Sequence, residues 1–253
     1  MQKYRHYAAE INKIYCRYTD LVQPFSIDES WLDVTASHKL FGSGREIADT
    51  IRFSVKEELG LTFSAGVSFN KIFAKMGPEY KKPDATTEIT RENFRTLLWL
   101  LLIRELFTVG PATAKQCIQR GMRTIGALAE AQPAFLESFL GRSGRMLWAY
   151  ANGLDESPVS RFTDEEDIKS IGNGTTFRKD LYTSDEILTA VTALSDTVAA
   201  RLRRAGRKAC GVKVDIKSPE LKTISRQKQL LQPTYLVSEL VSAAMEILQS
   251  SWQ

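Results

Sequence analysis

Apolar residues recur along this chain with two different periods, and the two periods predict different secondary structures. Spacings of three and four residues indicate amphipathic helices, whereas strict alternation indicates strands that are buried on one face. Residues 1–20 show the helical spacing, and their stripe of tyrosines and isoleucines is expected to face a core. Residues 210–217 alternate, with Val212, Val214 and Ile216 between lysines and an aspartate. The chain therefore contains both helices and strands.

The order of these elements predicts an α+β protein of several domains. In residues 1–90 we expect a helix, a hairpin around residue 28, a helix that Gly60 ends, and a strand–helix–strand unit (61–67, 70–76 and 86–89). Strands that alternate with helices favour an α/β sheet covered by helices. Residues 91–154 read as helices alone, the last from Pro133 to Asn152, and residues 155–167 read as an acidic linker that includes Asp164-Glu165-Glu166-Asp167.

The last third, residues 168–253, has the order strand, helix, strand, strand, helix. Residues 168–177 read as a strand that Gly172 and Gly174 interrupt, and Thr183 and Glu186 form a capping box at the start of the next helix. A second strand over residues 223–229 places Arg226 and Lys228 on one face. A split β-α-β unit has this order with one more strand at its end.

Two adjacent carboxylates, Asp28 and Glu29, lie at the turn of the first hairpin. Neighbouring carboxylates repel each other and are poor strand formers. A bound Mg²⁺ is one way to offset that repulsion, because Mg²⁺ in proteins is usually held by one or two carboxylates together with substrate phosphates. The other interpretation, a solvated polar turn, stays open on these residues alone.

Composition and charge narrow the class of protein. The chain has 253 residues, of which 43% are apolar and 25% charged, as in ordinary globular proteins. We find neither a bilayer-spanning apolar run nor a signal-peptide pattern, and the three distant cysteines match no metal spacing, so we expect a cytoplasmic location. Residues 169–253 carry thirteen basic and eight acidic side chains. This basic excess suits contact with a phosphate backbone, and it also suits solubility.

Two further stretches resemble binding motifs. Ser68-Phe69-Asn70-Lys71-Ile72-Phe73-Ala74-Lys75 leads to Lys81-Lys82-Pro83, and its lysines form either a solvated face or a binding site. Leu106-Phe107-Thr108-Val109-Gly110-Pro111-Ala112-Thr113-Ala114 predicts a helix–turn–helix, because proline is favoured at the first position of a helix. Backbone N–H groups at such a turn are suited to a phosphate.

Residues Ser26-Ile27-Asp28-Glu29-Ser30-Trp31-Leu32-Asp33-Val34-Thr35 resemble the second catalytic motif of the Y-family DNA polymerases, the translesion enzymes. The two stretches above and Lys169-Ser170-Ile171-Gly172-Asn173-Gly174-Thr175-Thr176-Phe177 are similar to later parts of the same family, in the same order. The resemblance implies a partial palm over residues 1–90, an all-helical thumb with a helix-hairpin-helix over 91–154, a linker over 155–167, and an incomplete little finger of split β-α-β type over 168–253.

The resemblance also implies roles for individual residues. It makes Asp28 and Glu29 ligands of catalytic Mg²⁺ in a two-metal mechanism, and it makes Lys82 the lysine that steadies the triphosphate of the incoming nucleotide. It implies phosphate contacts by the turn at Val109, Gly110 and Ala112, although Thr108 stands where the motif commonly has glycine and Pro111 lacks an N–H. In the basic sheet, the residues expected to follow the DNA backbone are Lys213, Lys217, Arg226 and Lys228.

The family pattern includes parts that this sequence does not contain. They are a further metal-binding aspartate on a strand that would precede Met1, the fingers with their steric-gate aromatic, the last little-finger strand, and a tail for the sliding clamp. We therefore expect a monomeric fragment of a polymerase, weakly active or inactive alone, whose partners are primer-template DNA and deoxynucleoside triphosphates. A non-catalytic DNA-binding remnant is the alternative. A third alternative is a nucleotide cyclase, which shares palm-like carboxylate chemistry. The helical hairpin and the basic C-terminal module count against it, because a cyclase does not need to grip a duplex.

Overall fold

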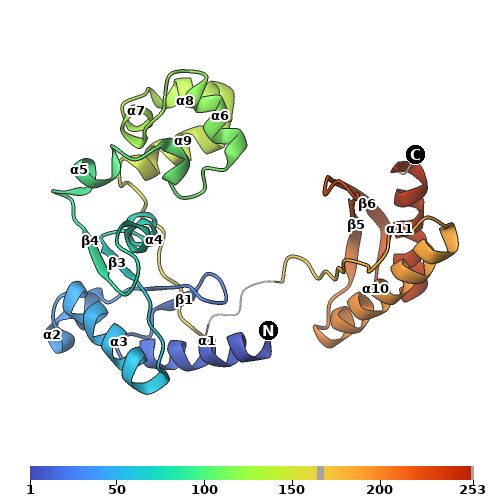
Figure 1. Ribbon diagram of the computed structural model, residues 1–253, viewed down its shortest axis with the longest axis horizontal. Helices are drawn as coiled ribbons and strands as arrows, with labels where there is room; N and C mark the ends of the chain where they lie inside the picture. The colour runs from blue at the N-terminus through green and yellow to red at the C-terminus, as the bar shows by residue number, and fades with distance from the viewer. Residues whose placement is uncertain (164–167, 252–253) are drawn as a thin grey trace. The chain divides into compact units, whose positions relative to one another are not determined.

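The computed structural model describes residues 1–163 and 168–251, and these residues form two compact units, Met1–Glu165 and Glu166–Gln253. Figure 1 traces the chain from blue to red. Each unit is described by itself. The expectation of a solvated linker at Asp164–Asp167 lies outside the described residues. The predicted boundary between residues 1–90 and 91–154 stays a prediction, because both stretches belong to the first unit.

The first unit begins with helices and two small sheets. Its helices are α1 (Gln2–Tyr15), α2 (His38–Phe41) after the 3-10 turn η1 (Thr35–Ser37), and α3 (Gly44–Leu59), which ends at Gly60 with φ +66° as predicted. Strands β1 (Val22–Pro24) and β2 (Ser30–Leu32) form the expected antiparallel hairpin, in which Gln23 pairs with Trp31. Strands β3 (Ala65–Ser68) and β4 (Thr86–Ile89) pair in parallel, and helix α4 (Lys71–Tyr80) connects them along the chain.

Helix α4 lies directly against β3, and two glycines make this approach possible. A Cβ on Gly66 would lie 2.0 Å from the carbonyl oxygen of Ala74, and a Cβ on Gly77 would lie 2.7 Å from the Cα of Gly66. The helix begins with Asn70 as its cap, whose side chain accepts a hydrogen bond from the N–H of Phe73. The contact between Gly66 and Gly77 sets the distance of α4 from β3.

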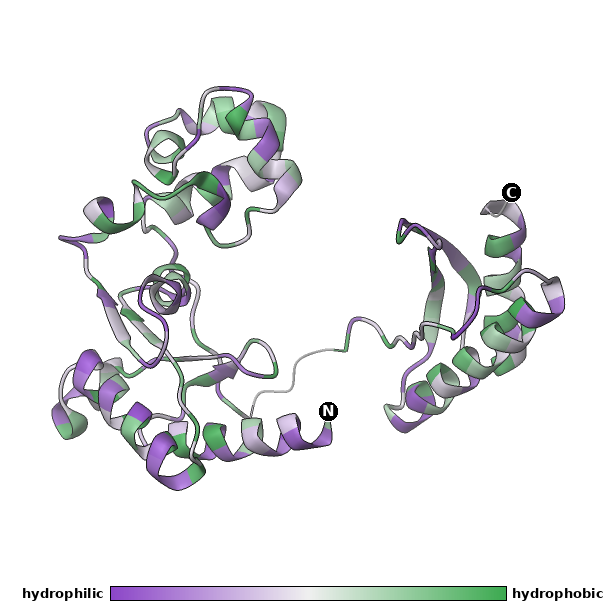
Figure 2. Ribbon diagram, viewed as in Figure 1, coloured by the Kyte–Doolittle hydropathy of each residue, from purple (hydrophilic) through white to green (hydrophobic). Residues whose placement is uncertain are grey.

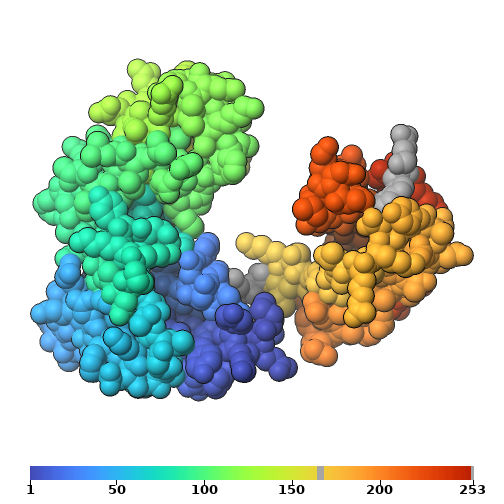
Figure 3. All heavy atoms as spheres, viewed as in Figure 1, coloured from blue at the N-terminus to red at the C-terminus, as the bar shows by residue number. Residues whose placement is uncertain are grey.

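The helical part of the first unit continues the same hydrophobic core, and Figure 3 shows its atoms beside those of α4. It contains α5 (Phe94–Leu98), the 3-10 turn η2 (Ile103–Glu105), α6 (Pro111–Ile118), α7 (Ile125–Ala129), α8 (Pro133–Leu140) and α9 (Arg142–Ala151). The prediction of one helix from Pro133 to Asn152 is wrong, because Gly141, with φ +61° and ψ −147°, breaks it into α8 and α9.

The expected burial of the tyrosine stripe on α1 holds at one end of the helix only. Ile14 is buried against Ile47, Ile51 and Val55 of α3, whereas Tyr4 is 69% and Tyr7 41% exposed. The first half of α1 extends beyond α3 (Figure 1), so Tyr4 and Tyr7 have no apolar side chains of α3 to pack against.

The second unit contains a long hairpin and two helices. Its elements are α10 (Ser184–Arg204), β5 (Ala209–Lys217), β6 (Thr223–Thr234) and α11 (Val237–Ser251). The capping box of Thr183 and Glu186 is present, and Lys179 with two backbone N–H groups lowers the pKa of Glu186 to about 2. In Figure 2 both helices carry green apolar and purple polar residues, as amphipathic helices do.

Two sequence expectations fail in this unit. Residues 168–177 form no strand: Ile171 packs on the small core and Gly172 accepts a hydrogen bond of 2.8 Å from Arg201, but no strand pairs with this segment. Two glycines weaken its strand tendency further. Cys210 does not continue the buried alternation of Val212 and Val214, because the pairing of β5 with β6 shifts between Ala209 and Gly211 and leaves Cys210 exposed.

The contact between α4 and β3 predicts the effect of a single added methyl group. Gly77→Ala should lower the free energy of unfolding by about 1–3 kcal/mol, since overpacking outweighs the better helix propensity of alanine. Urea unfolding followed by the fluorescence of Trp31, Trp99 and Trp148, all in the first unit, measures it. Glu57→Ala on α3 is the control. An unchanged or higher stability of Gly77→Ala would show that α4 does not depend on this close approach.

Candidate active site

The turn of the first hairpin presents its two carboxylates differently. The N–H groups of Phe25 and Ser26 donate to the carbonyl of Glu29, at 2.8 and 3.3 Å, and close the turn. The hydroxyl of Ser26 donates to the Oδ1 atom of Asp28 at 2.7 Å. Asp28 is exposed and Glu29 is half-buried. The sequence therefore places one carboxylate toward solvent and the next toward the protein.

An aromatic and cationic cluster fixes this hairpin to helix α4. The indole Nε1 of Trp31 donates to the carbonyl of Lys71 at 3.0 Å, and the Lys71 ammonium lies 4.7 Å from the centre of the Trp31 ring. Phe25 and Phe107 pack against Trp31 with ring centroids 4.7 and 6.3 Å away. The hairpin is thereby attached both to the first turn of α4 and to the segment that precedes α6.

Lys71 also holds the chain that follows α9. Its ammonium donates to the Oε1 atom of Gln23 at 2.7 Å and to the carbonyl of Pro158 at 3.0 Å. The same Gln23 oxygen accepts the N–H of Ser160 at 3.3 Å. Burial lowers the pKa of Lys71, while the carboxylate of Asp155 acts in the opposite direction. Lys71 is thus a structural tether, whose ammonium is taken up by groups of the chain itself.

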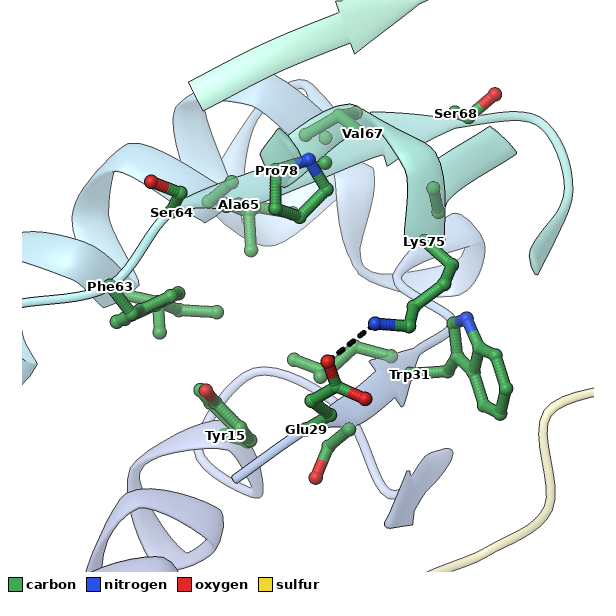
Figure 4. A pocket seen from close by; sticks show the side chains of 18 of the residues that line it. Tyr15, Glu29, Trp31, Phe63, Ser64, Ala65, Val67, Ser68, Lys75 and Pro78 are labelled. Carbon is green, nitrogen blue, oxygen red and sulfur yellow. Dashed lines mark hydrogen bonds and ion pairs between the residues drawn. The ribbon is translucent and has the colours of Figure 1, made fainter. Parts of the chain in front are cut away.

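Glu29 forms an ion pair with Lys75, one turn further along α4, as Figure 4 shows. The side chain of Lys75 is 24% and that of Glu29 39% exposed. The ammonium lies where a cation would neutralise Glu29, so the repulsion between the adjacent carboxylates is already reduced by a residue of the chain itself. The spacing of Lys71 and Lys75 predicts a shared face, but it does not predict this partner.

A cavity of about 480 Å³ lies beside the pair. Among the described residues that line it are all of β2 and all of β3, together with apolar side chains of α1 and α3. Within the described residues, β2 pairs with β1 only and β3 with β4 only, and neither β1 nor β4 lines the cavity. The free edges of two sheets therefore border one hollow, which Figure 4 shows between Tyr15, Phe63, Val67 and Glu29.

Lys82 lines the same cavity as Asp28 and Glu29. It follows α4 in the loop that leads to β4, its side chain is exposed, and its ammonium forms an ion pair with Glu79. The structure thus brings three of the residues singled out in the sequence around one hollow, although 53 residues separate Glu29 from Lys82 along the chain. Two carboxylates and a lysine around one cavity suit a ligand that carries both a divalent cation and phosphate groups.

The donor set fits Mg²⁺ in kind. Both carboxylates supply hard oxygen ligands, and Asp28 reaches solvent, where a cation and its waters have room. In residues 1–163 and 168–251, His, Cys, Asp and Glu side chains nowhere gather in a group of three or more that would hold a metal. Asp28 and Glu29 therefore offer two carboxylates at the hairpin, fewer than such a group would need.

The turn before α6 differs from the predicted helix-hairpin-helix. The element before the turn is the 3-10 turn η2, not a helix, and Thr108 adopts φ +73°. Val109 is buried, and its N–H donates to the carbonyl of Leu106 at 3.0 Å, so it is not available to a phosphate. Gly110 precedes Pro111 at the start of α6, and Ala112 is exposed in its first turn, where N–H groups lack partners within the helix.

The four basic residues of the hairpin β5–β6 lie on two opposite faces. Arg226 pairs with Val214 and Lys228 with Val212, so both point to the side of the sheet whose valine packs on the helices, and Lys228 forms an ion pair with Glu246 of α11. Lys213 and Lys217, which pair with Gln227 and Thr223, point to the other face. The register therefore separates the four candidates for DNA contact into two pairs on opposite faces of the sheet.

Two family models match this chain. The model of the impB/mucB/samB family matches residues 1–79, and the model of the C-terminal domain of that family matches residues 168–253. The chain therefore belongs to the impB/mucB/samB family. Its fold is that of the Y-family DNA polymerases: a Y-family DNA polymerase chimera superimposes with a TM-score of 0.84 at 22% identity, over 98% of this chain and 71% of the chimera.

Among named relatives, the chain is similar to DNA polymerase IV of several bacteria. It is 43% identical to DNA polymerase IV of Acetivibrio thermocellus and 34% identical to that of Clostridium kluyveri, each over 98% of this chain. The chain spans 62% of the length of both relatives. Helices long and apolar enough to cross a membrane are absent from the part of the chain that the structure describes.

Proposed function

We propose that this chain is part of a template-directed DNA polymerase of the translesion type, which catalyses Mg²⁺-dependent nucleotidyl transfer. The observation that carries the proposal is the placement of Asp28, Glu29 and Lys82 around one cavity. Residues 1–90 would act as palm, 91–154 as thumb and 168–253 as little finger. Its partners would be primer-template DNA and deoxynucleoside triphosphates, and the sliding clamp through a segment outside this chain. We infer a monomer in the bacterial cytoplasm.

The side chains divide the chemistry between them. When bound, paired Mg²⁺ ions would activate the primer 3′-oxygen and neutralise the departing pyrophosphate. Asp28 and Glu29 would supply carboxylate oxygens for them. Lys75 neutralises Glu29 and keeps its carboxylate directed into the cavity. Lys82, a flexible point charge, would neutralise a non-bridging phosphate oxygen once it leaves Glu79.

A further carboxylate is part of the proposal. Two-metal sites gather several carboxylates around ions that lie ~3.5–4 Å apart. Asp28 and Glu29 alone supply too few carboxylates to hold two ions. The cavity between the free edges of β2 and β3 supports an additional strand from outside this chain, because each edge offers unpaired backbone N–H and C=O groups. The missing aspartate would come with that strand.

The DNA contacts would come from two regions. The N–H groups at Gly110 and Ala112 are suited to one phosphate, while Val109 is excluded by its own hydrogen bond. In the β5–β6 hairpin, we assign the DNA-facing side to Lys213 and Lys217, because the other face carries the valines that pack on the helices. Such contacts fix the position of the duplex and carry no base specificity.

One observation favours a second function, a DNA-binding remnant without catalysis. Glu29 is already neutralised by Lys75, and the described residues supply two clustered carboxylates at the hairpin, not three. For this chain alone, salt-dependent DNA binding without nucleotide incorporation is the outcome that this second function predicts.

Asp28→Asn tests the catalytic proposal. In an enzyme made by joining this chain to the segments that it lacks relative to the Acetivibrio thermocellus polymerase, the substitution should abolish Mg²⁺-dependent primer extension, because a neutral amide is a poor ligand for Mg²⁺. DNA affinity should stay nearly unchanged. Gel-resolved extension and fluorescence anisotropy measure the two properties. Asp20→Asn, on an exposed aspartate outside the cavity, is the matched control. Extension that survives Asp28→Asn would refute the assignment.

The two faces of the β5–β6 hairpin give a second test, on this chain as it is. Lys213→Ala combined with Lys217→Ala should weaken DNA binding and reduce the slope of log K against log salt by about 2, one for each phosphate that is no longer neutralised. The matched pair Arg226→Ala and Lys228→Ala should change the slope little. Anisotropy titrations at several salt concentrations measure it. A larger effect of the Arg226/Lys228 pair would place the DNA on the opposite face.

A further inference from the structure

The loop that carries Lys82 is held by contacts from outside it. Residues 81–85 join α4 to β4, and Asp84 has φ +49°, a left-handed conformation that a non-glycine residue adopts at a cost. The carbonyl of Ala85 accepts the N–H of Ala65 at 2.9 Å, at the end of the β3–β4 pairing. Lys81 and Lys82 themselves are exposed. The position of Lys82 therefore depends on what fixes Asp84.

Arg52 of α3 is the residue that fixes it. The guanidinium donates to the carboxylate of Asp84 through Nη2 at 2.7 Å and through Nε at 3.2 Å, and Nη2 also donates to the carbonyl of Asp84. Nε donates in addition to the carbonyl of Phe63 at 3.3 Å. One side chain, 18% exposed, thus joins α3, the segment before β3 and the loop of Lys82.

The remaining nitrogen of Arg52, Nη1, takes part in a hydrogen-bonded network with Asp49 and Thr86. Nη1 donates to the Oδ1 atom of Asp49 at 3.0 Å and to the hydroxyl of Thr86 at 3.2 Å, and that hydroxyl donates to Asp49 at 2.6 Å. Thr86 is buried at the start of β4. The network therefore holds the loop at Asp84 and at Thr86, the first residue of β4.

The same contacts balance the charge of Asp84. Its carboxylate lies two residues from Lys82 and lines the same cavity, so an unpaired negative charge would repel a triphosphate there. Arg52 pairs with Asp84 directly, and the Lys56 ammonium lies 3.9 Å from its Oδ2 atom. A lysine at position 52 would keep the charge but not the planar fork that reaches several acceptors at once.

We infer that Arg52 is a positioning residue of the triphosphate site: it acts through the loop 81–85 on Lys82 and touches no substrate itself. This inference rests on the proposed function, because it takes Lys82 to be the triphosphate ligand. Displacement of a charged group by about 1 Å is enough to weaken a site that depends on geometry. Arg52 therefore sets the affinity for the phosphates, while the sugar and base are bound by other residues.

A double-mutant cycle tests the inference on this chain with dATP and Mg²⁺ in the presence of primer-template DNA. Arg52→Lys should weaken dATP binding, measured by calorimetry, by about fivefold, the worth of roughly one hydrogen bond. In the Lys82→Ala background the same substitution should have no further effect, because the residue through which it acts is absent. Binding of deoxyadenosine, which carries no phosphate, should stay unchanged. Arg45→Lys, on the same helix and 3.8 Å from Asp49, is the control.

Two further measurements distinguish the positioning role of Arg52 from a purely structural role. Hydrogen exchange should increase in residues 81–85 of Arg52→Lys and stay unchanged in α9. If Arg52→Lys fails to fold, Asp84→Ala removes the other side of the contact from a partly exposed loop and should show the same dependence on Lys82.

The outcomes distinguish the two levels of the proposal. Suppose that Lys82→Ala weakens dATP binding. If Arg52→Lys then leaves dATP binding unchanged, or weakens it by the same factor with Lys82 present and with Lys82→Ala, the positioning role of Arg52 is overturned and the proposed nucleotide site stands. If Lys82→Ala itself leaves dATP affinity unchanged, the proposed site fails, and the role of Arg52 fails with it.

Discussion

The first hairpin takes its position from its attachment to helix α4. A five-residue turn between strands of three residues each has little stability of its own. Trp31 and Lys71 connect this hairpin to the first turn of α4, and Glu29 pairs with Lys75 one turn later. Gly66 and Gly77 bring α4 directly onto β3. Because the hairpin is attached to α4, its position is set by the β3–β4 sheet through this helix.

The same helix also determines where Lys82 lies. Glu29 pairs with Lys75 at the middle of α4, and Lys82 follows the end of the helix, so α4 links the positions of these two cavity-lining residues. The Arg52 network fixes the loop after α4, and the Lys71 tether fixes the chain after α9. These contacts hold the two hairpin carboxylates and Lys82 around one cavity.

The sequence predicts those features that depend on neighbouring residues. The hairpin, the end of α3 at Gly60, the capping box at Thr183 and strand β4 all follow from local patterns, and all are present. Features that depend on distant residues do not follow from such patterns. The Glu29–Lys75 pair joins residues 46 apart in the chain, and Arg52 reaches Asp84 across 32 residues, so no local spacing indicates either interaction.

Some errors have equally specific causes. A single glycine, Gly141, divides a helix that the apolar spacing shows as continuous, and the shift in register beside Cys210 cannot be read from alternation alone. The separation of Lys213 and Lys217 from Arg226 and Lys228 follows from the pairing of the two strands, which the turn between them determines. The sequence thus identifies candidate site residues by type, while their partners and faces require the fold.

Divalent-cation binding at the first hairpin can be mapped by affinity cleavage of this chain with Fe²⁺, ascorbate and peroxide, in the presence of primer-template DNA and dATP. Bound Fe²⁺ in place of Mg²⁺ generates radicals that cut the backbone near its ligands. If Asp28 and Glu29 bind the cation, cuts are expected beside both residues and in the facing segment at β3, and these cuts should be suppressed by excess Mg²⁺ and absent in Asp28→Asn. Cuts elsewhere, or cuts at the hairpin that persist in Asp28→Asn, would contradict this assignment.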